Sequence, residues 1–180
     1  MNYKTHKIGG ICAGSIVVCS ILPNPLNTLN SFDFGAISVA SLVMAGSIIG
    51  SSIPDIDKRG SYISKKLGVV SAIASLAGHR KFFHSPLFII ILSGILNYLA
   101  LFFNGVYQSL YYSLVIGITF GAISHLLVDS MTVSGIPLLY PITNKKIRIA
   151  KFRTKQDEFL VSSILVGVTI FIIFAILKLK

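Results

Sequence analysis

The sequence predicts an all-α, polytopic membrane protein with about five transmembrane helices and one further helix at the cytoplasmic membrane surface. Of its 180 residues, 53% are hydrophobic and only 12% are charged, whereas roughly 25% charged residues is typical of soluble domains. Apolar content this high excludes intrinsic disorder. The net charge of +10 has an explanation within a membrane protein, because Lys and Arg set its orientation. We therefore expect the membrane as a partner, and no nucleic acid.

Five apolar stretches reach, or nearly reach, the ~20 helical residues that cross a bilayer core. They cover residues 8–22, 34–53, 86–103, 109–128 and 159–176, and we assign residues 1–180 to a single membrane-embedded domain. Pro23 and Pro54 end the first two stretches, because proline cannot continue a helix. The first stretch is short, and it reaches span length only if residues 5–7 lie in the interface.

The basic residues occur in alternate loops. Fourteen of the sixteen lie in the N-terminal tail, the loop after the second stretch and the loop after the fourth, while the loops after the first and third contain none. The positive-inside rule makes the first side cytoplasmic, so we expect the N-terminus inside and the C-terminus outside. Within the first large basic loop, residues 61–78 have one apolar face at helical spacing, which predicts an interfacial helix. A solvated helix packed against the spans is the alternative.

The histidines and half of the acidic residues gather at the cytoplasmic ends of these predicted spans. His125 and Asp129 are four residues apart, so they share one face of a helix. A polar side chain inside an apolar span is costly and usually functional. Asp55 and Asp57 follow directly after Pro54, where the second span ends.

This convergence predicts a metal site, with unrelated interfacial polar residues as the alternative. A mixed set of imidazoles and carboxylates suits zinc, with manganese or iron as other choices. The set exceeds one tetrahedral site, so one or two divalent ions are expected. The candidate ligands are His6, Asp55, Asp57, His79, His84, His125 and Asp129.

The candidates for catalysis near the same face are Asp57, Arg80 and Ser85, of which Asp57 is also a candidate ligand. Arg80, together with Lys81, suits a phosphate group, because a guanidinium binds phosphate through two parallel hydrogen bonds. Asp57 is a candidate general base if it is not a ligand, and Asp55 is the alternative. Ser85 precedes Pro86 and should cap the third span. Its hydroxyl is also a candidate donor to the metal ligands, with the hydroxyl of Thr132 as the alternative.

Four motifs together carry a resemblance to a known family. They are Thr5-His6-Lys7 with Gly9-Gly10, the segment 50–57, the segment from His79-Arg80 to His84-Ser85, and the segment 124–129 with Thr132, Gly135 and Pro137. Their order and spacing resemble the YdjM family of inner-membrane predicted metal-dependent hydrolases, from residue 5 to about residue 141. The resemblance implies a metal-dependent hydrolase in the cytoplasmic membrane of a prokaryote.

The ligand order is also similar to that of zinc-dependent phospholipase C and P1-type nucleases. That comparison implies that His6, Asp55, His125 and Asp129 hold metal, with either His84 or His79. The chain lacks the N-terminal Trp ligand of those enzymes and their second downstream His-x-x-x-Asp/Glu pair.

The leading functional hypothesis is a phosphoester hydrolase that acts on a lipid or lipid-linked substrate at the cytoplasmic face. The alternative is a non-catalytic protein, either metal-stabilised or a metal-ion carrier. A carrier should place polar residues near the membrane midplane, whereas these cluster at one face. If the ligands share a site, His125 must lie within about 8 Å of Asp55 or His84, because bonds to zinc are only about 2.0–2.2 Å long.

Overall fold

The computed structural model describes residues 1–23, 25, 33–57 and 82–180, and in these ranges every regular element is helical. The only ladder pairings among them are two isolated β-bridges, Thr132 with Phe152 and Ile136 with Ile147. The predicted all-α class is therefore confirmed. The elements are α1 (Tyr3–Ile21), α3 (Phe34–Gly50), α6 (Pro86–Leu99), α7 (Gly105–Ser130) and α8 (Glu158–Leu179), with the 3-10 turns η1 (Ile53–Asp57), η2 (Phe82–His84) and η3 (Ala100–Phe102).

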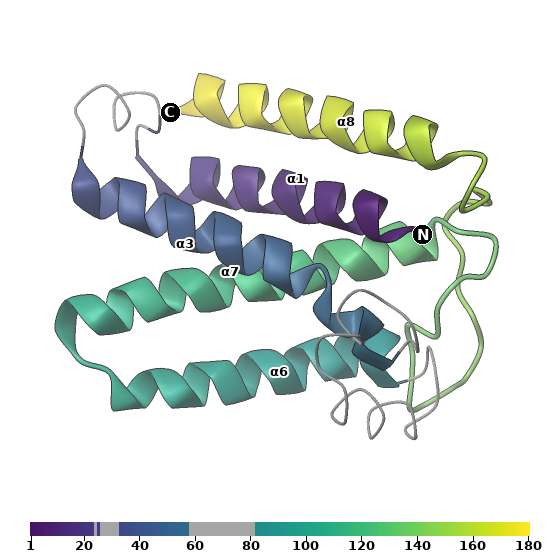
Figure 1. The fold of residues 1–180 in the computed structure, drawn as a ribbon, viewed down its shortest axis with the longest axis horizontal. Coiled ribbons are helices and arrows are strands. Elements are labelled where there is room, and N and C mark those ends of the chain that lie inside the picture. Colours follow the sequence, from purple (N-terminus) through teal and green to yellow (C-terminus); the bar gives the residue numbers. More distant parts are fainter. Residues whose placement is uncertain (24, 26–32, 58–81) are drawn as a thin grey trace.

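The helices run side by side along one long axis, with α1, α3 and α7 at the centre (Figure 1). On one side α6 packs against α7, and on the other α8 packs against α1. The N-terminus lies at the end of the bundle where α7 finishes and α8 begins, and the C-terminus lies at the opposite end. We call the end with the N-terminus the amino end of the bundle.

Helix ends agree with the capping signals in the sequence. Asp33 caps α3 by accepting hydrogen bonds from the backbone N–H groups of Gly35 and Ala36. Ser85 caps α6, with Pro86 in the first helical position as expected. Helix α7 begins four residues before the expected 109 and ends two after the expected 128, because polar residues at the edges of the apolar stretch also adopt helix.

Among the described residues, three helices are long and apolar enough to cross a membrane. They are Phe34–Ile56, which joins α3 to η1, then Gly105–Ser130 and Glu158–Leu179. The segment Pro86–Phe102 is apolar but shorter. Helix α1 has 19 residues and includes Lys4 and Lys7. A count of five spans therefore stays a prediction, and the expected helix at 61–78 lies outside the described residues.

Close approach of small residues holds α3 against α7. Gly46 and Gly50 on α3, and Gly117 and Gly121 on α7, form two Gly-x-x-x-Gly patterns. A Cβ added at any of the four would overlap backbone atoms of the other helix. Helices in membranes associate through such small-residue contacts, since burial in lipid provides no hydrophobic driving force. The buried Ser47 hydroxyl donates to the carbonyl of Gly10 at 2.6 Å, which ties α3 to α1 as well.

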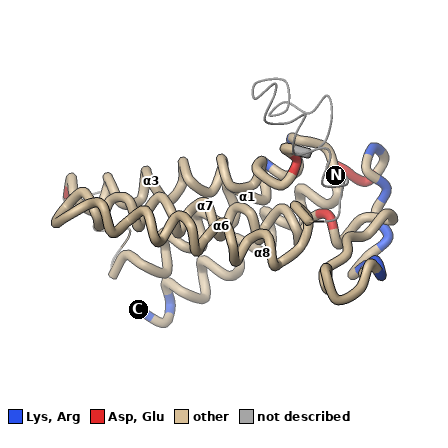
Figure 2. The backbone as a smooth tube through the Cα atoms, turned by 90° about the horizontal axis from the view of Figure 1, so that it is seen from below, with Lys and Arg blue, Asp and Glu red and all other residues tan. Residues whose placement is uncertain are grey.

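The connection 131–157 is folded against the amino end of the bundle. The backbone N–H of Ile149 donates to the Ser130 carbonyl at 2.9 Å, and that of Phe152 donates to the Met131 carbonyl at 3.0 Å. Gly135 adopts a φ of 59°, a conformation that favours glycine. Figure 2 shows that the Lys and Arg residues of the described ranges gather at this end, apart from those near the C-terminus. The predicted separation of charge is thus present in the structure, while the side of the membrane stays a prediction.

Candidate metal centre

Four helical elements bring their ends together at the amino end of the bundle. His6 comes from the first turns of α1, Asp55 from η1, His84 from η2, and His125 with Asp129 from the last turns of α7. The residues are up to 123 positions apart in the sequence. His6, His84, His125 and Asp129 are all buried, at 2% exposure or less.

His125 is held in one tautomer by a backbone carbonyl. Its Nδ1 lies 2.7 Å from the carbonyl oxygen of Ser51, and a carbonyl only accepts, so Nδ1 carries the proton. Ser51 caps the end of α3, where carbonyl groups lack helical partners. The Nε2 lone pair of His125 is therefore directed into the cluster, as in histidines that bind metals.

Three ligand atoms form a nearly equilateral triangle. His84 Nε2 lies 3.4 Å from His125 Nε2 and 3.4 Å from Asp129 Oδ2, and His125 Nε2 lies 3.6 Å from the same oxygen. Ligand atoms 2.0–2.2 Å from a tetrahedral ion lie about 3.3–3.6 Å apart. The triangle therefore fits three ligands of one zinc-like ion.

The second oxygen of Asp129 faces a different set of groups. Its Oδ1 accepts from the α-amino group of Met1 at 2.6 Å and lies 3.3 Å from His6 Nε2. Both ring nitrogens of His6 are buried without an aligned hydrogen bond, which is unusual for buried polar atoms and suits a metal ligand. The carboxylate of Asp129 therefore presents one oxygen to His84 and His125 and the other to His6.

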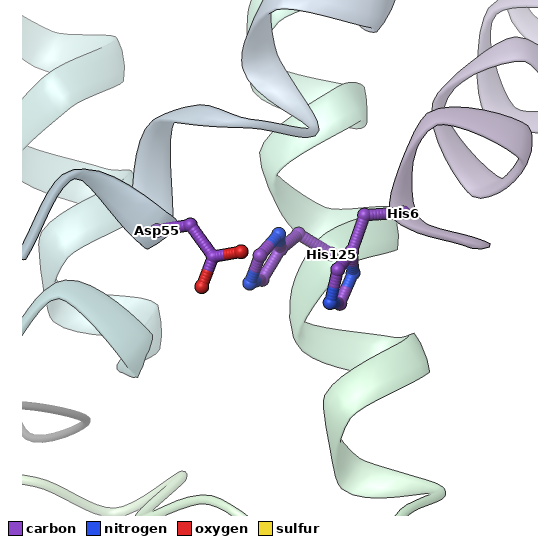
Figure 3. A group of neighbouring side chains, drawn as sticks. All are labelled: His6, Asp55 and His125. Atoms are coloured by element: carbon purple, nitrogen blue, oxygen red, sulfur yellow. The ribbon is translucent and has the colours of Figure 1, made fainter. Parts of the chain in front are cut away.

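Asp55 completes the cluster from the side of η1. Its carboxylate is directed toward His125, whose ring stacks on that of His6 with the centroids 3.8 Å apart and an interplanar angle of 11° (Figure 3). Asp55 Oδ1 lies 3.9 Å from His84 Nε2. Two groups can hold an ion, His6–Asp55–His125 and His84–His125–Asp129. They share His125, which has one free nitrogen for one ion, so they describe a single composite centre.

The remaining predicted site residues are not part of this cluster as described. His79, Arg80 and Lys81 lie outside the described residues, as does the side chain of Asp57. The Ser85 hydroxyl donates to the Phe82 carbonyl and accepts from the Phe88 N–H, so its visible role is capping. The Thr132 hydroxyl donates to the backbone carbonyl of Asp129 at 2.8 Å. It therefore supports the end of α7 without touching the carboxylate.

Two contacts of the site could not be predicted from the sequence. The first is the ammonium of Met1, which compensates the buried charge of Asp129. The second is the Ser51 carbonyl, a backbone group with no signature in the sequence. Met1 is five residues before His6, so the predicted position of His6 at the site already implies that Met1 lies nearby.

The fold and the cluster define a multi-pass helical membrane protein with a buried His/Asp centre at one end of its bundle. A family model described as "YdjM inner membrane protein" matches residues 1–179. The chain belongs to the YdjM family, which confirms the resemblance and supports a multi-pass location in the inner membrane.

Individual relatives agree with this assignment. The chain is 32% identical over 171 residues to "Uncharacterized protein YvsG" of Bacillus subtilis (strain 168), which covers 94% of this chain and 91% of that one. It is 33% identical over 102 residues to "Inner membrane protein YdjM" of Escherichia coli (strain K12), covering 55% of this chain and 49% of the relative. A protein of the same name from Shigella flexneri matches equally. No solved structure matches the chain.

Proposed function

We propose that the protein is a membrane-bound, metal-dependent hydrolase that cleaves a phosphoester bond in a lipid or lipid-linked substrate at the cytoplasmic face. The triangle of His84 Nε2, His125 Nε2 and Asp129 Oδ2 carries the proposal, because its edges of 3.4–3.6 Å fit three ligands of one ion. The position at one end of the bundle supports a substrate in the head-group region.

The residues of the cluster have distinct roles in this proposal. When bound, a divalent ion supplies Lewis acidity and lowers the pKa of a coordinated water toward 7. Asp55 is 3.9 Å from His84, and its side chain is 13% exposed, so its carboxylate is placed to hold the proton that the water loses. The Ser51 carbonyl keeps His125 in the tautomer that binds. Arg80 is the expected partner of the substrate phosphate.

A non-catalytic, metal-stabilised protein is the second candidate. Burial of His6, His84 and His125 at 0–1% exposure favours it, because structural metal sites are closed while catalytic sites keep a position for substrate. A metal-ion carrier gains no such support, since the described cluster comes from the first turns of α1 and the last turns of α7 and not from the middle of these helices.

Metal analysis followed by activity measurement tests the proposal. Protein purified in detergent is analysed for zinc, manganese and iron, and is then incubated with a panel of phospholipids and soluble phosphoesters. We expect about one to two ions per chain and turnover on at least one member of the panel. The His84→Gln variant should lose metal by 10-fold or more, as expected for loss of one ligand.

The matched control is Ser124→Ala. Ser124 is buried on α7 beside His125, but its hydroxyl donates to the Gly121 carbonyl of its own helix. It should keep both metal and activity. Metal in the wild type without turnover on any phosphoester would favour the structural candidate, and an unchanged metal content in His84→Gln would refute the site itself.

A further inference from the structure

A second concave site lies between α1 and α8, apart from the His/Asp cluster. It is a groove of about 840 Å³, formed where α8 lies alongside α1 (Figure 1). Residues near the starts of both helices form its amino end, and residues in the middle of α8 line the rest. Its lining includes Lys4, Ile8, Lys155, Gly167 and Ile170.

The groove is separate from the metal centre. On α1, Lys4 and Ile8 are one helical turn apart and share a face, and that face lines the groove. His6 lies two residues from each, on the opposite side of the helix, where it stacks on His125. The groove therefore takes no part in the proposed hydrolysis, and a ligand in the groove does not depend on that proposed function.

The lining of the groove changes from polar to apolar along its length. Lys4 and Lys155 at the amino end are exposed, and neither forms an ion pair with another described residue. Glu158 shares this end, but its carboxylate accepts from Asn2 and Thr5 of α1. With the carboxylate of Glu158 counted, the charged side chains at this end sum to +1, and neither ammonium group is paired with that carboxylate.

The apolar part of the groove has open space along it. A Cβ added at Gly167 would meet nothing within 4 Å, and Ile170 is 63% exposed. Ile170 lies 12 residues after Glu158, which is about 18 Å along a helix. One hydrocarbon leaflet is roughly 15 Å thick, so the groove extends about as deep as one acyl chain.

We propose that this groove binds an anionic phospholipid, with its phosphate between Lys4 and Lys155 and an acyl chain alongside Gly167 and Ile170. Charge selects the ligand: each Lys near a membrane surface favours an anionic lipid by a factor of roughly five. The polar end of the groove matches the head group of the lipid, and the apolar part that follows it matches the acyl chain. The proposed ligand is a lipid and not a soluble phosphate, because a phosphate alone would leave the apolar part of the groove without a partner.

Quenching of a single tryptophan by brominated lipid tests the proposal, because the chain contains no Trp. Ile170→Trp reports on the groove. Ile95→Trp on α6 is a matched reporter, since Ile95 is 55% exposed and lines no groove described here. Each variant is reconstituted in vesicles of phosphatidylcholine and phosphatidylglycerol, with either lipid brominated in turn. The ratio of quenching gives the preference for phosphatidylglycerol at each position.

We expect a preference of roughly fivefold or more at Ile170→Trp and a value near one at Ile95→Trp. Adding Lys4→Gln and Lys155→Gln to the groove reporter should bring its preference close to one. Gly167→Leu should reduce quenching at Ile170→Trp, whereas Gly94→Leu, which also adds a side chain in open space, should not. Equal preference at both reporters, or a preference that survives the loss of both lysines, would overturn the proposal.

Discussion

Replacing Gly121 with alanine should separate α7 from α3 and destabilise the bundle. The added Cβ would lie 2.8 Å from both the carbonyl carbon and the Cα of Ser47, and would overlap the Ser47 carbonyl oxygen. Carbon atoms in contact are normally about 3.5–4.0 Å apart. Backbone atoms cannot rotate away as a side chain does, so the helices must move apart by roughly 1 Å.

The magnitude follows from two opposing effects. Overpacking a tightly packed contact costs about 1–3 kcal/mol, while Gly to Ala in a helix gains roughly 0.5–1 kcal/mol from backbone entropy. Gly94→Ala on α6 is the control, because its Cβ would meet nothing within 4 Å. It should gain this entropy term alone. The difference in stability between the two variants should therefore be about 1–3 kcal/mol.

Equilibrium unfolding in mixed detergent micelles measures this difference. A second readout is metal content, because α3 carries the Ser51 carbonyl that orients His125 of α7. We expect Gly121→Ala to lower both the free energy of unfolding and the metal content. Gly94→Ala should lower neither. If the two variants were equally stable, the contact between Gly121 and Ser47 would not hold these helices together, and the packing argument would be wrong.

Three further predictions concern the ends of helices and the metal. Asp33→Ala should lower the free energy of unfolding by about 1 kcal/mol, because two N–H groups of α3 lose their acceptor, whereas Asp33→Asn should keep most of it. Lys180 donates from Nζ to the carbonyls of Cys19, Ser20 and Leu22, so Lys180→Met should speed hydrogen exchange at the end of α1, and unchanged exchange would contradict this. Chelation should lower the thermal midpoint of the wild type but not of His84→Gln, since only an ion bound to the folded state stabilises it.

The helices were largely predictable because their signals are local. An apolar stretch of span length, a proline at its end and a capping Asp or Ser act within a few residues of each other. Ser85 accordingly caps α6 as expected, and α3 begins at Phe34, the first residue of the predicted stretch. Helix α7 begins four residues before its predicted apolar stretch, because hydropathy marks the apolar part of a helix and not its full hydrogen-bonded length.

The cluster itself was predictable only in outline. Topology placed His6, His84, His125 and Asp129 at one membrane face, and the structure brings all four within contact distance there. Which histidines share an oxygen of Asp129 depends on the rotation of each helix about its axis. Hydropathy carries almost no information on that rotation when a helix is apolar all round.

The sequence by itself determined the class of the protein, the approximate positions of its described helices, and the shared end of the helices at which His6, His84, His125 and Asp129 lie, because each follows from local composition and the length of an apolar stretch. Tertiary structure alone decided which helices are neighbours and how they are turned. The close contacts of Gly50 and Gly121 set both, and they place the Ser51 carbonyl on His125. Contacts between residues distant in sequence require complementary backbones, and no single segment contains that information.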